Sequence, residues 1–191
     1  MEITDLKCLT PNEKFLKLWK VRTNENKLWV FASRKEKPEV IYHSDKADVV
    51  VIVPFLKDKI VLTKEYRMAI NDYELGFPAG LVDGNEKVED TAKRELFEET
   101  GLSTKNILLV SPILYTSSGL TDETFLYVFI EAEGNISTKN QEKTEKIEPI
   151  IVSRKNINKY ITNSDIKLSS RLWPIVTMIE LFSIESNLVN V

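Results

Sequence analysis

The chain has 191 residues, of which 42% are apolar and 29% charged, a composition typical of a globular protein with one sizeable core. The 26 basic and 29 acidic residues give a net charge of −3, so general binding to nucleic acid is not expected. The single cysteine, Cys8, excludes an internal disulfide, and no apolar run reaches the roughly 18 residues of a membrane span, so we expect a cytoplasmic protein.

The N-terminal part predicts an antiparallel β extension. Residues 13–21 and 27–34 are apolar and aromatic runs separated by a polar turn cluster at 23–26, which is typical of a hairpin. Residues 40–42 are expected to continue it. The extension is therefore predicted to occupy residues 1–45, and the main domain residues 46–191.

The main domain opens with two predicted strands and a helix. Residues 48–55 form a nearly continuous β-branched run, which indicates a strand buried on both faces, and residues 59–64 predict a second strand. A loop containing residues 77–80 then leads to a helix. That helix is predicted to begin near residues 88–90 and to end at Gly101, which suits a left-handed cap.

Further strands and helices are predicted for the second half of the chain. The pattern indicates strands at 107–115, 124–131 and 147–152, with a polar loop at 133–146, a short helix after Ser153 and a last helix from Ser169 or Ser170 to about residue 184. Strands and helices in this order predict an α/β fold with a central mixed sheet between helices.

The predicted helix at 88–100 carries an unusual row of acids. Glu95, Glu98 and Glu99 are spaced i, i+3 and i+4, which places them on one face. Such like charges repel by roughly 0.2–0.5 kcal/mol per pair in an isolated helix. Composition alone favours an exposed, solvated face, but a divalent cation with oxygen ligands would turn the repulsion into a binding site.

The residues around this row carry a family resemblance. The pattern of fixed residues resembles the Nudix box at nine positions: Gly80, Glu86, Arg94, Glu95, Leu96, Glu98, Glu99, Gly101 and Leu102. This resemblance implies a Nudix α/β/α sandwich with a central mixed sheet, here preceded by the N-terminal antiparallel extension. It also implies metal-dependent hydrolysis of a diphosphate linkage.

The resemblance assigns roles within the box. It makes Glu95, Glu98 and Glu99 the ligands of Mg²⁺, with Mn²⁺ as the alternative, beside the backbone carbonyl of Ala79 or Gly80; Glu98 and Glu99 thereby take part in catalysis. Structural roles fall to the other fixed positions, among which Arg94 would pair with a carboxylate to orient the helix. Glu86 would stabilise the loop or lie in an outer metal shell, and the remaining structural positions are Gly80 and Gly101.

A second element points to one branch of the family. Glu65-Tyr66-Arg67, followed by residues 73–81 (YELGFPAGL), looks like the ADP-ribose pyrophosphatase branch, in which the arginine contacts the substrate's phosphates. A planar, permanently charged guanidinium suits that role, so Arg67 is the expected phosphate-binding residue.

The loop at 117–123 resembles the Ser-Pro-Gly-x-x-x-Glu loop of the same branch. The match covers Ser117, Gly119 and Glu123, and it assigns Gly119 and Glu123 to substrate binding. Ser118 stands where the branch has proline. This departure leaves UDP- and GDP-sugars as alternatives to ADP-ribose.

Related enzymes place a catalytic glutamate on a loop just before the late strand. Glu145 matches that position best, because it lies two residues before Ile147, while Glu142 and Glu148 are the alternatives. This glutamate would deprotonate the attacking water.

The resemblance finally implies a partner and a substrate. The N-terminal sheet would form a homodimer, and Trp19, Trp29, Phe31 or Tyr42 could stack on a base. The expected substrate is the small molecule ADP-ribose, hydrolysed to AMP and ribose 5-phosphate. The alternatives are a nucleoside triphosphatase, a dinucleoside polyphosphate hydrolase, or a non-catalytic nucleotide-sugar sensor.

Overall fold

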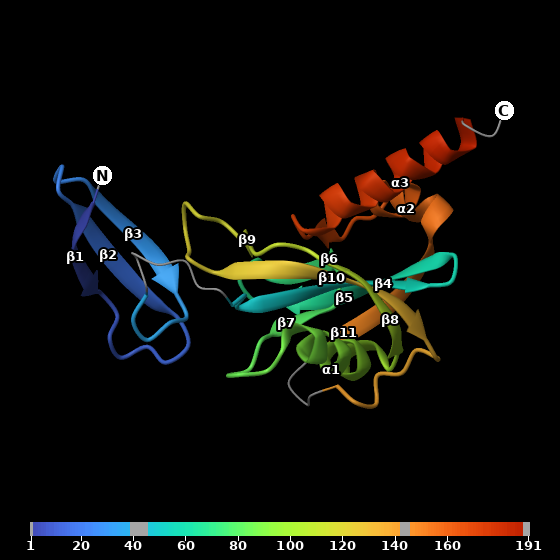
Figure 1. Cartoon of the computed structure of the whole chain (residues 1–191), viewed down its shortest axis with the longest axis horizontal. Helices are drawn as coiled ribbons and strands as arrows, with labels where there is room; N and C mark the ends of the chain where they lie inside the picture. Colours follow the sequence, from blue (N-terminus) through green and yellow to red (C-terminus); the bar gives the residue numbers. More distant parts are fainter. Residues whose placement is uncertain (1, 39–45, 142–145, 189–191) are drawn as a thin grey trace. The chain divides into compact units, whose positions relative to one another are not determined.

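The chain forms two compact units, and each of them combines two separate segments of the sequence. The first unit combines Met1–Val49 with Pro112–Leu126, and the second combines Val50–Ser111 with Tyr127–Val191. The computed structural model describes residues 2–38, 46–141 and 146–188, with side chains up to Leu181 (Figure 1). The first unit therefore contains the predicted extension together with a later segment of the chain.

The first unit is built on a three-stranded antiparallel sheet. Its strands are β1 (Ile3–Cys8), β2 (Lys17–Thr23) and β3 (Leu28–Ser33), in the order β1-β2-β3. The predicted hairpin is confirmed as β2 and β3, whereas β1 was not predicted because its residues alternate poorly between apolar and polar. The predicted continuation at residues 40–42 lies outside the described residues.

A large mixed sheet forms the centre of the second unit. Its main path runs β12-β6-β5-β4-β10-β8, with β11 paired to β5 and β7 paired to β4; β12 runs parallel to β6, whereas β5 is antiparallel to β6 and β11. The strands of this path and its branches are β4 (Val49–Leu56), β5 (Lys59–Arg67), β6 (Asp72–Gly76), β7 (Ala79–Leu81), β8 (Ser103–Val110), β10 (Thr124–Glu133), β11 (Ile147–Ser153) and β12 (Lys167–Leu168), with β9 (Leu114–Tyr115) paired to the start of β10.

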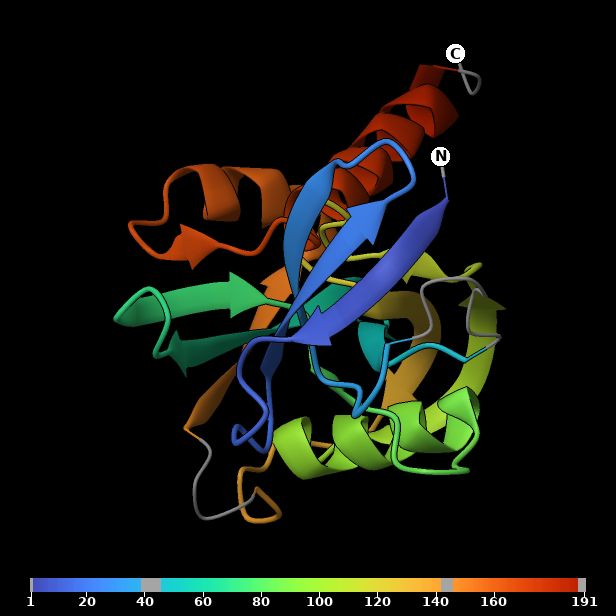
Figure 2. The ribbon, with the colours of Figure 1, turned by 90° about the vertical axis from the view of Figure 1, so that its left-hand side faces the viewer.

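Helices cover both faces of this sheet. Helix α1 (Val88–Thr100) lies on one face, and α2 (Ile157–Thr162) and α3 (Leu172–Leu188) lie on the other, with a short 3₁₀ turn, η1 (Arg154–Asn156), before α2 (Figures 1 and 2). This arrangement confirms the predicted α/β/α sandwich. Within the described part of the chain, no helix is long and apolar enough to cross a membrane.

The core of the second unit follows the hydrophobic pattern. Val50 to Val53 of β4 are fully or almost fully buried, as the β-branched run predicted, and Ile60 to Leu62 of β5 lie beside them. Helix α1 contributes Ala92 and Leu96, four residues apart on its inner face. These contacts hold α1 against the sheet and so determine where its acidic residues lie.

Some predicted boundaries differ from the structure. The strand expected at 107–115 is instead β8 together with a separate two-residue strand, β9 (Leu114–Tyr115). The last helix begins at Leu172 rather than at Ser169 or Ser170, and the Ser169 amide donates to the carbonyl of Leu75 in β6. Ser153 lies at the N-cap position of η1, but its side chain makes no capping hydrogen bond.

Candidate functional site

Residues at both termini of helix α1 favour the start and the end of the helix where they are observed. Glu89 and Asp90 lie in its first turn, where negative charge interacts favourably with the helix dipole. At the other end, Gly101 has φ of 74° and its amide donates to the Phe97 carbonyl, the left-handed cap that the sequence predicted. Both termini therefore agree with the predicted range of the acidic helix.

The three acids of α1 differ in exposure. The side chain of Glu98 is 35% exposed and that of Glu95 is 13% exposed, whereas residue Glu99 is only 3% exposed. Burial of a carboxylate is unfavourable unless hydrogen bonds or cations compensate for the lost hydration. Packing alone therefore does not explain why a carboxylate stands at Glu99, the most buried of the three acids.

Arg94 lies among the acids of this region. Its Nη1 donates to Glu95 Oε1 at 2.7 Å and to Glu98 Oε2 at 3.1 Å, while its Nη2 donates to Glu86 Oε2 at 3.0 Å. One guanidinium thus joins the loop before α1 to two acids of the helix.

The contacts of Arg94 shift the ionisation of its partners. The hydrogen bond from Arg94, and after it the one from the Thr91 hydroxyl, lowers the pKa of Glu86 below its usual range. In return, the hydrogen bond to Glu86, followed by those to Glu95 and Glu98, raises the pKa of Arg94. Glu86 and Arg94 are therefore both held in their charged forms.

Gly80 allows a close approach between β7 and α1. A Cβ atom at this position would fall 1.9 Å from the carboxyl carbon of Glu95. Only a residue without a side chain leaves room for the Glu95 carboxylate where it lies now. Gly80, the first glycine of the box, thus lies directly against Glu95, the first acid of the predicted ligand set.

The donor groups suit a hard divalent cation. Among the described residues, no three His, Cys, Asp or Glu side chains are arranged as a ready-made metal site, and Arg94 contacts the carboxylates of Glu95 and Glu98. The groups themselves are oxygen donors, which Mg²⁺ prefers, and the space at Gly80 admits a carboxylate beside the backbone. The residues therefore fit such a cation, and their roles as ligands remain a prediction.

Arg67 lies at the end of β5, in the second unit, which also contains α1. Its Nη1 donates to Glu65 Oε1 at 2.6 Å and its Nε to Glu74 Oε2 at 3.2 Å. Glu65 and Glu74 are directly paired across β5 and β6, which places both carboxylates beside the guanidinium. Glu74 was not singled out from the sequence, because its partnership depends on the register of β6, a strand that was not predicted.

Gly119 and Glu123 belong to the first unit, where Gly119 contacts Trp29 near the start of β3 and Glu123 contacts Arg34 just after its end. Glu123 accepts hydrogen bonds from Arg34 Nε at 3.1 Å and from the Thr116 hydroxyl at 3.0 Å. The carbonyl of Gly119 accepts from Trp29 Nε1 at 3.2 Å. Arg34 is 89 positions from Glu123 in the sequence, so no local pattern could have revealed this pair.

The candidate bases are only partly described. Glu142 and Glu145 lie outside the described residues, so the choice of Glu145 stays a prediction. Glu148 lies in β11 and accepts a hydrogen bond from Lys64 at 3.1 Å; Lys64 also lies 4.8 Å from the centre of the Tyr73 ring. These three side chains line a hollow of about 360 Å³ together with Thr138, Gln141, Lys146 and Ile147.

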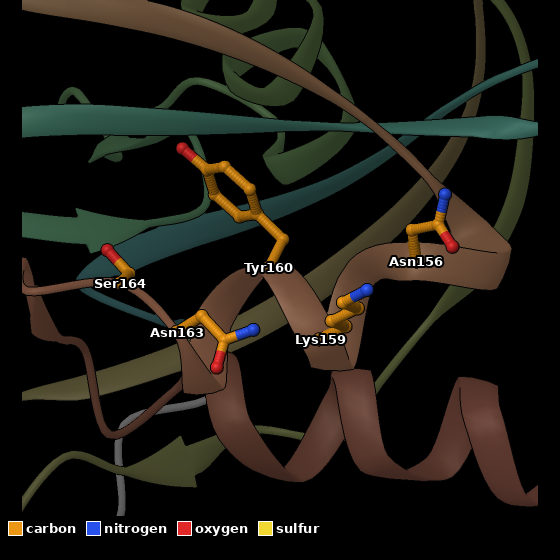
Figure 3. Close-up of a pocket in the computed structure, with 5 residues that line it drawn as sticks. All are labelled: Asn156, Lys159, Tyr160, Asn163 and Ser164. Carbon is orange, nitrogen blue, oxygen red and sulfur yellow. The ribbon is translucent and has the colours of Figure 1, made fainter.

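A second hollow, of about 420 Å³, lies at α2 in the second unit. Figure 3 shows the Tyr160 ring directed from this helix toward the neighbouring strands. The residues that line the hollow are Asn156, Lys159, Tyr160, Asn163 and Ser164. None of them is acidic, so the carboxylate chemistry of α1 has no counterpart there.

Comparisons of the whole chain relate it to known proteins. The NUDIX domain family model matches residues 45–172. An uncharacterized Nudix hydrolase of Schizosaccharomyces pombe is 30% identical over 190 residues, which are 97% of this chain and 83% of the relative. The ADP-ribose pyrophosphatase of Bacillus subtilis is 30% identical over 112 residues, covering 59% of this chain and 58% of the relative.

A solved structure shares the fold. The crystal structure of an ADP compounds hydrolase matches with a TM-score of 0.72 over 97% of this chain and 96% of that chain, at 18% identity. At this level of identity the match concerns the fold alone.

Proposed function

Because the chain belongs to the Nudix hydrolase family, we propose that it hydrolyses the diphosphate linkage of a nucleoside diphosphate sugar, with ADP-ribose as the first candidate. The observation that carries this proposal is the geometry of α1, where Glu95 lies against Gly80 and Glu99 is buried on the same helix. The name of the Bacillus subtilis relative supports ADP-ribose as the substrate.

The carboxylates of Glu95, Glu98 and Glu99, with the backbone carbonyl of Ala79 or Gly80, are proposed to hold Mg²⁺ or Mn²⁺. Bound there, a divalent cation would neutralise phosphate charge and make the attacking water easier to deprotonate. Arg94 has a separate role, because it bridges Glu86 to Glu95 and Glu98 and thereby orients the helix side chains. Gly80, Glu86 and Gly101 complete this structural set.

Arg67 is proposed to bind the diphosphate. Its guanidinium is partly exposed and already oriented by Glu65 and Glu74, so little side-chain entropy is lost when an anion binds. Charge-assisted hydrogen bonds from a guanidinium to phosphate oxygens are stronger than neutral ones. Binding of this kind also fixes the phosphorus atom for attack by water.

Glu145 is proposed to take the proton from the attacking water. The water oxygen forms a bond to one phosphorus, the bond from that phosphorus to the bridging oxygen breaks, and the bridging oxygen leaves with the other phosphate. With ADP-ribose the products are AMP and ribose 5-phosphate. Gly119 and Glu123 are proposed as substrate-binding residues, and Ser118 keeps UDP- and GDP-sugars as alternative substrates.

A substrate panel tests the proposal. The purified chain is assayed with ADP-ribose, UDP- and GDP-sugars, nucleoside triphosphates and dinucleoside polyphosphates, in Mg²⁺ or Mn²⁺, and the products are separated by chromatography. We expect AMP and ribose 5-phosphate from ADP-ribose. Cleavage of triphosphates alone would show that the proposed substrate is wrong, but it would leave the proposal for the hydrolytic site intact.

Glu99→Gln tests the metal assignment. This variant keeps the size of the side chain but removes its charge, so we expect kcat to fall by more than about 100-fold while the fold is retained. Asp90→Asn is the matched control, because it removes an exposed carboxylate from the first turn of the same helix. Normal kinetics in Glu99→Gln would contradict the assignment.

A further inference from the structure

The C-terminal end of α1 is capped by a segment far along the chain. The last carbonyl groups of a helix have no partner within it, and they need donors from elsewhere. Here the Ser137 amide donates to the Thr100 carbonyl at 2.8 Å, and Gln141 Nε2 donates to the Glu99 carbonyl at 2.9 Å. Residues 137–141 thus supply donors to two successive carbonyls of the helix.

Gln141 also reaches the next strand. The same Nε2 donates to the carbonyl of Ile147, the first residue of β11, at 2.8 Å. A primary amide has two N–H donors, so one nitrogen can satisfy both carbonyls. The opposite orientation of the amide would place its oxygen against two carbonyl oxygens, so these contacts define which atom is the nitrogen.

The packing at Gly101 leaves little freedom to this segment. A Cβ atom at Gly101 would lie 2.6 Å from the Ser137 Cβ and 2.8 Å from the Ser137 amide nitrogen. The backbone of residue 137 is therefore in contact with the cap of α1. Gln141 extends from a segment that is itself held against the helix.

We propose that Gln141 is a positioning residue for the hydrolysis, because it ties the last turn of α1 to the start of β11. That turn carries Glu98 and Glu99, and the inference rests on their proposed function as ligands. Helix ends fray, whereas a catalytic site requires its groups to be held within about 0.5 Å of their working positions. A side chain that fixes the carbonyl of Glu99 therefore also restrains the carboxylate of the same residue.

The expected effect is on catalysis rather than on global stability. Two neutral hydrogen bonds contribute part, but not most, of the free energy that stabilises a domain, so their loss should lower the melting temperature by roughly a few degrees and leave the chain folded. Loosening the last turn of α1 moves the ligand carboxylates and weakens metal binding. Binding of the diphosphate should change little, because Arg67, its proposed binding residue, lies at the end of β5 and not on α1.

Gln141→Ala is the principal variant. We expect kcat to fall about 10–100-fold with KM within about 2-fold, and Mn²⁺ affinity, measured by calorimetry without substrate, to fall about 10-fold. Gln141→Glu should be at least as impaired, because a carboxylate would face two carbonyl oxygens. Gln141→Asn, one methylene shorter, keeps the amide donor and should recover part of the activity.

Asn140→Ala is the control, since Asn140 is the exposed neighbour in the same segment. Hydrogen exchange provides a structural measurement: amides in the last turn of α1 should exchange faster in Gln141→Ala, while the melting temperature falls by no more than roughly a few degrees. Unchanged kcat and Mn²⁺ affinity in Gln141→Ala would overturn the inference, as would a fall in melting temperature that accounts for the whole loss.

The failure of this inference can be told apart from a failure of the proposed function. If the wild-type chain cleaves no member of the substrate panel, the proposed function is wrong, while Mn²⁺ binding and hydrogen exchange still decide the role of Gln141. If the wild type is active and Gln141→Ala behaves like Asn140→Ala, only the positioning role is wrong.

Discussion

Gly80 shows how a missing side chain shapes the acidic site. In Gly80→Ala the new Cβ would overlap the Glu95 carboxyl group, which lies 1.9 Å away and would have to rotate out of its place. Because the end of a glutamate is flexible, we expect a small change in melting temperature but a loss of at least about 10-fold in Mn²⁺ affinity and kcat.

Gly76→Ala is the matched control for Gly80→Ala. A Cβ atom there would meet the Ser169 Cβ at 3.4 Å, an ordinary contact, in a strand that leads toward the same loop. Equal effects of the two substitutions would show that the close approach of Glu95 to Gly80 has no special role.

Glu86 makes the stability of this region dependent on pH. Arg94 lowers the pKa of Glu86 in the folded chain below its ordinary value of 4.5. A carboxyl with a lowered folded pKa stabilises the protein above its unfolded pKa, and this contribution is lost as the pH falls through the folded value. Wild type should therefore be more stable than Glu86→Gln at neutral pH.

Urea unfolding of both proteins at a series of pH values measures this difference. It should shrink once the pH falls below about 4.5, the range where the free carboxyl becomes protonated. A difference that stays constant down to the acid limit of folding would contradict the ion pair as its source.

At the scale of single elements, the end of α1 depends on Gly101. Alanine at φ of 74° costs about 1–2 kcal/mol in backbone strain, and its Cβ would also lie 2.6 Å from the Ser137 Cβ. We expect Gly101→Ala to lower the free energy of unfolding by about 2–4 kcal/mol, as measured by denaturant titration.

Gly84→Ala separates the two causes. Gly84 also has a positive φ, of 48°, but nothing lies within 4 Å of a Cβ there, so this variant carries backbone strain without a steric clash. Gly84→Ala should lower the free energy of unfolding by about 1–2 kcal/mol. If Gly101→Ala were no worse, the packing of residue 137 against the cap would contribute nothing.

Elements with a strong local signal were predicted from the sequence. Helix α1 has apolar residues at helical spacing and a glycine at its end, and β4 has a continuous β-branched run, so each signal lies within one segment. By contrast, β1, β6 and β12 mix polar and apolar residues and form because neighbouring strands pair with them. Their existence depends on tertiary structure, which local propensity does not contain.

The same division applies to the candidate site. The row of acids on α1 was visible as a spacing, because three residues within one helix suffice to show it. The contact of Arg34 with Glu123 and that of Gln141 with Glu99 join distant segments, separated by 89 and 42 positions. The residues of such pairs have no distinguishing local pattern, so only the folded structure reveals them.

At the scale of the whole molecule, we propose that the N-terminal sheet forms a homodimer. Leu18, Leu28 and Val30 are exposed on one face of β2 and β3, where their register pairs them with Ala32, Arg22 and Lys20 respectively. A cluster of exposed apolar side chains on a sheet face is typical of an interaction surface. Sedimentation of the 22.0 kDa chain should therefore give a particle of twice this mass.

The double variant Leu28→Lys/Val30→Lys tests this surface. Two added charges on the exposed face should prevent association, so sedimentation should give the mass of a monomer while circular dichroism stays unchanged. Lys20→Ala, on the same face, is the control for a change that adds no charge. A dimer that survives the double substitution would place the interface elsewhere.

The capping of α1 by residues 137–141 also constrains the order in which the protein folds. During synthesis the helix leaves the ribosome about 40 residues before the donors that complete its last turn, Ser137 and Gln141. A nascent chain that ends before residue 137 thus lacks two of the hydrogen bonds at the end of its acidic helix. We infer that the predicted ligand carboxylates reach their final arrangement only after this later segment has been translated and has closed the loop.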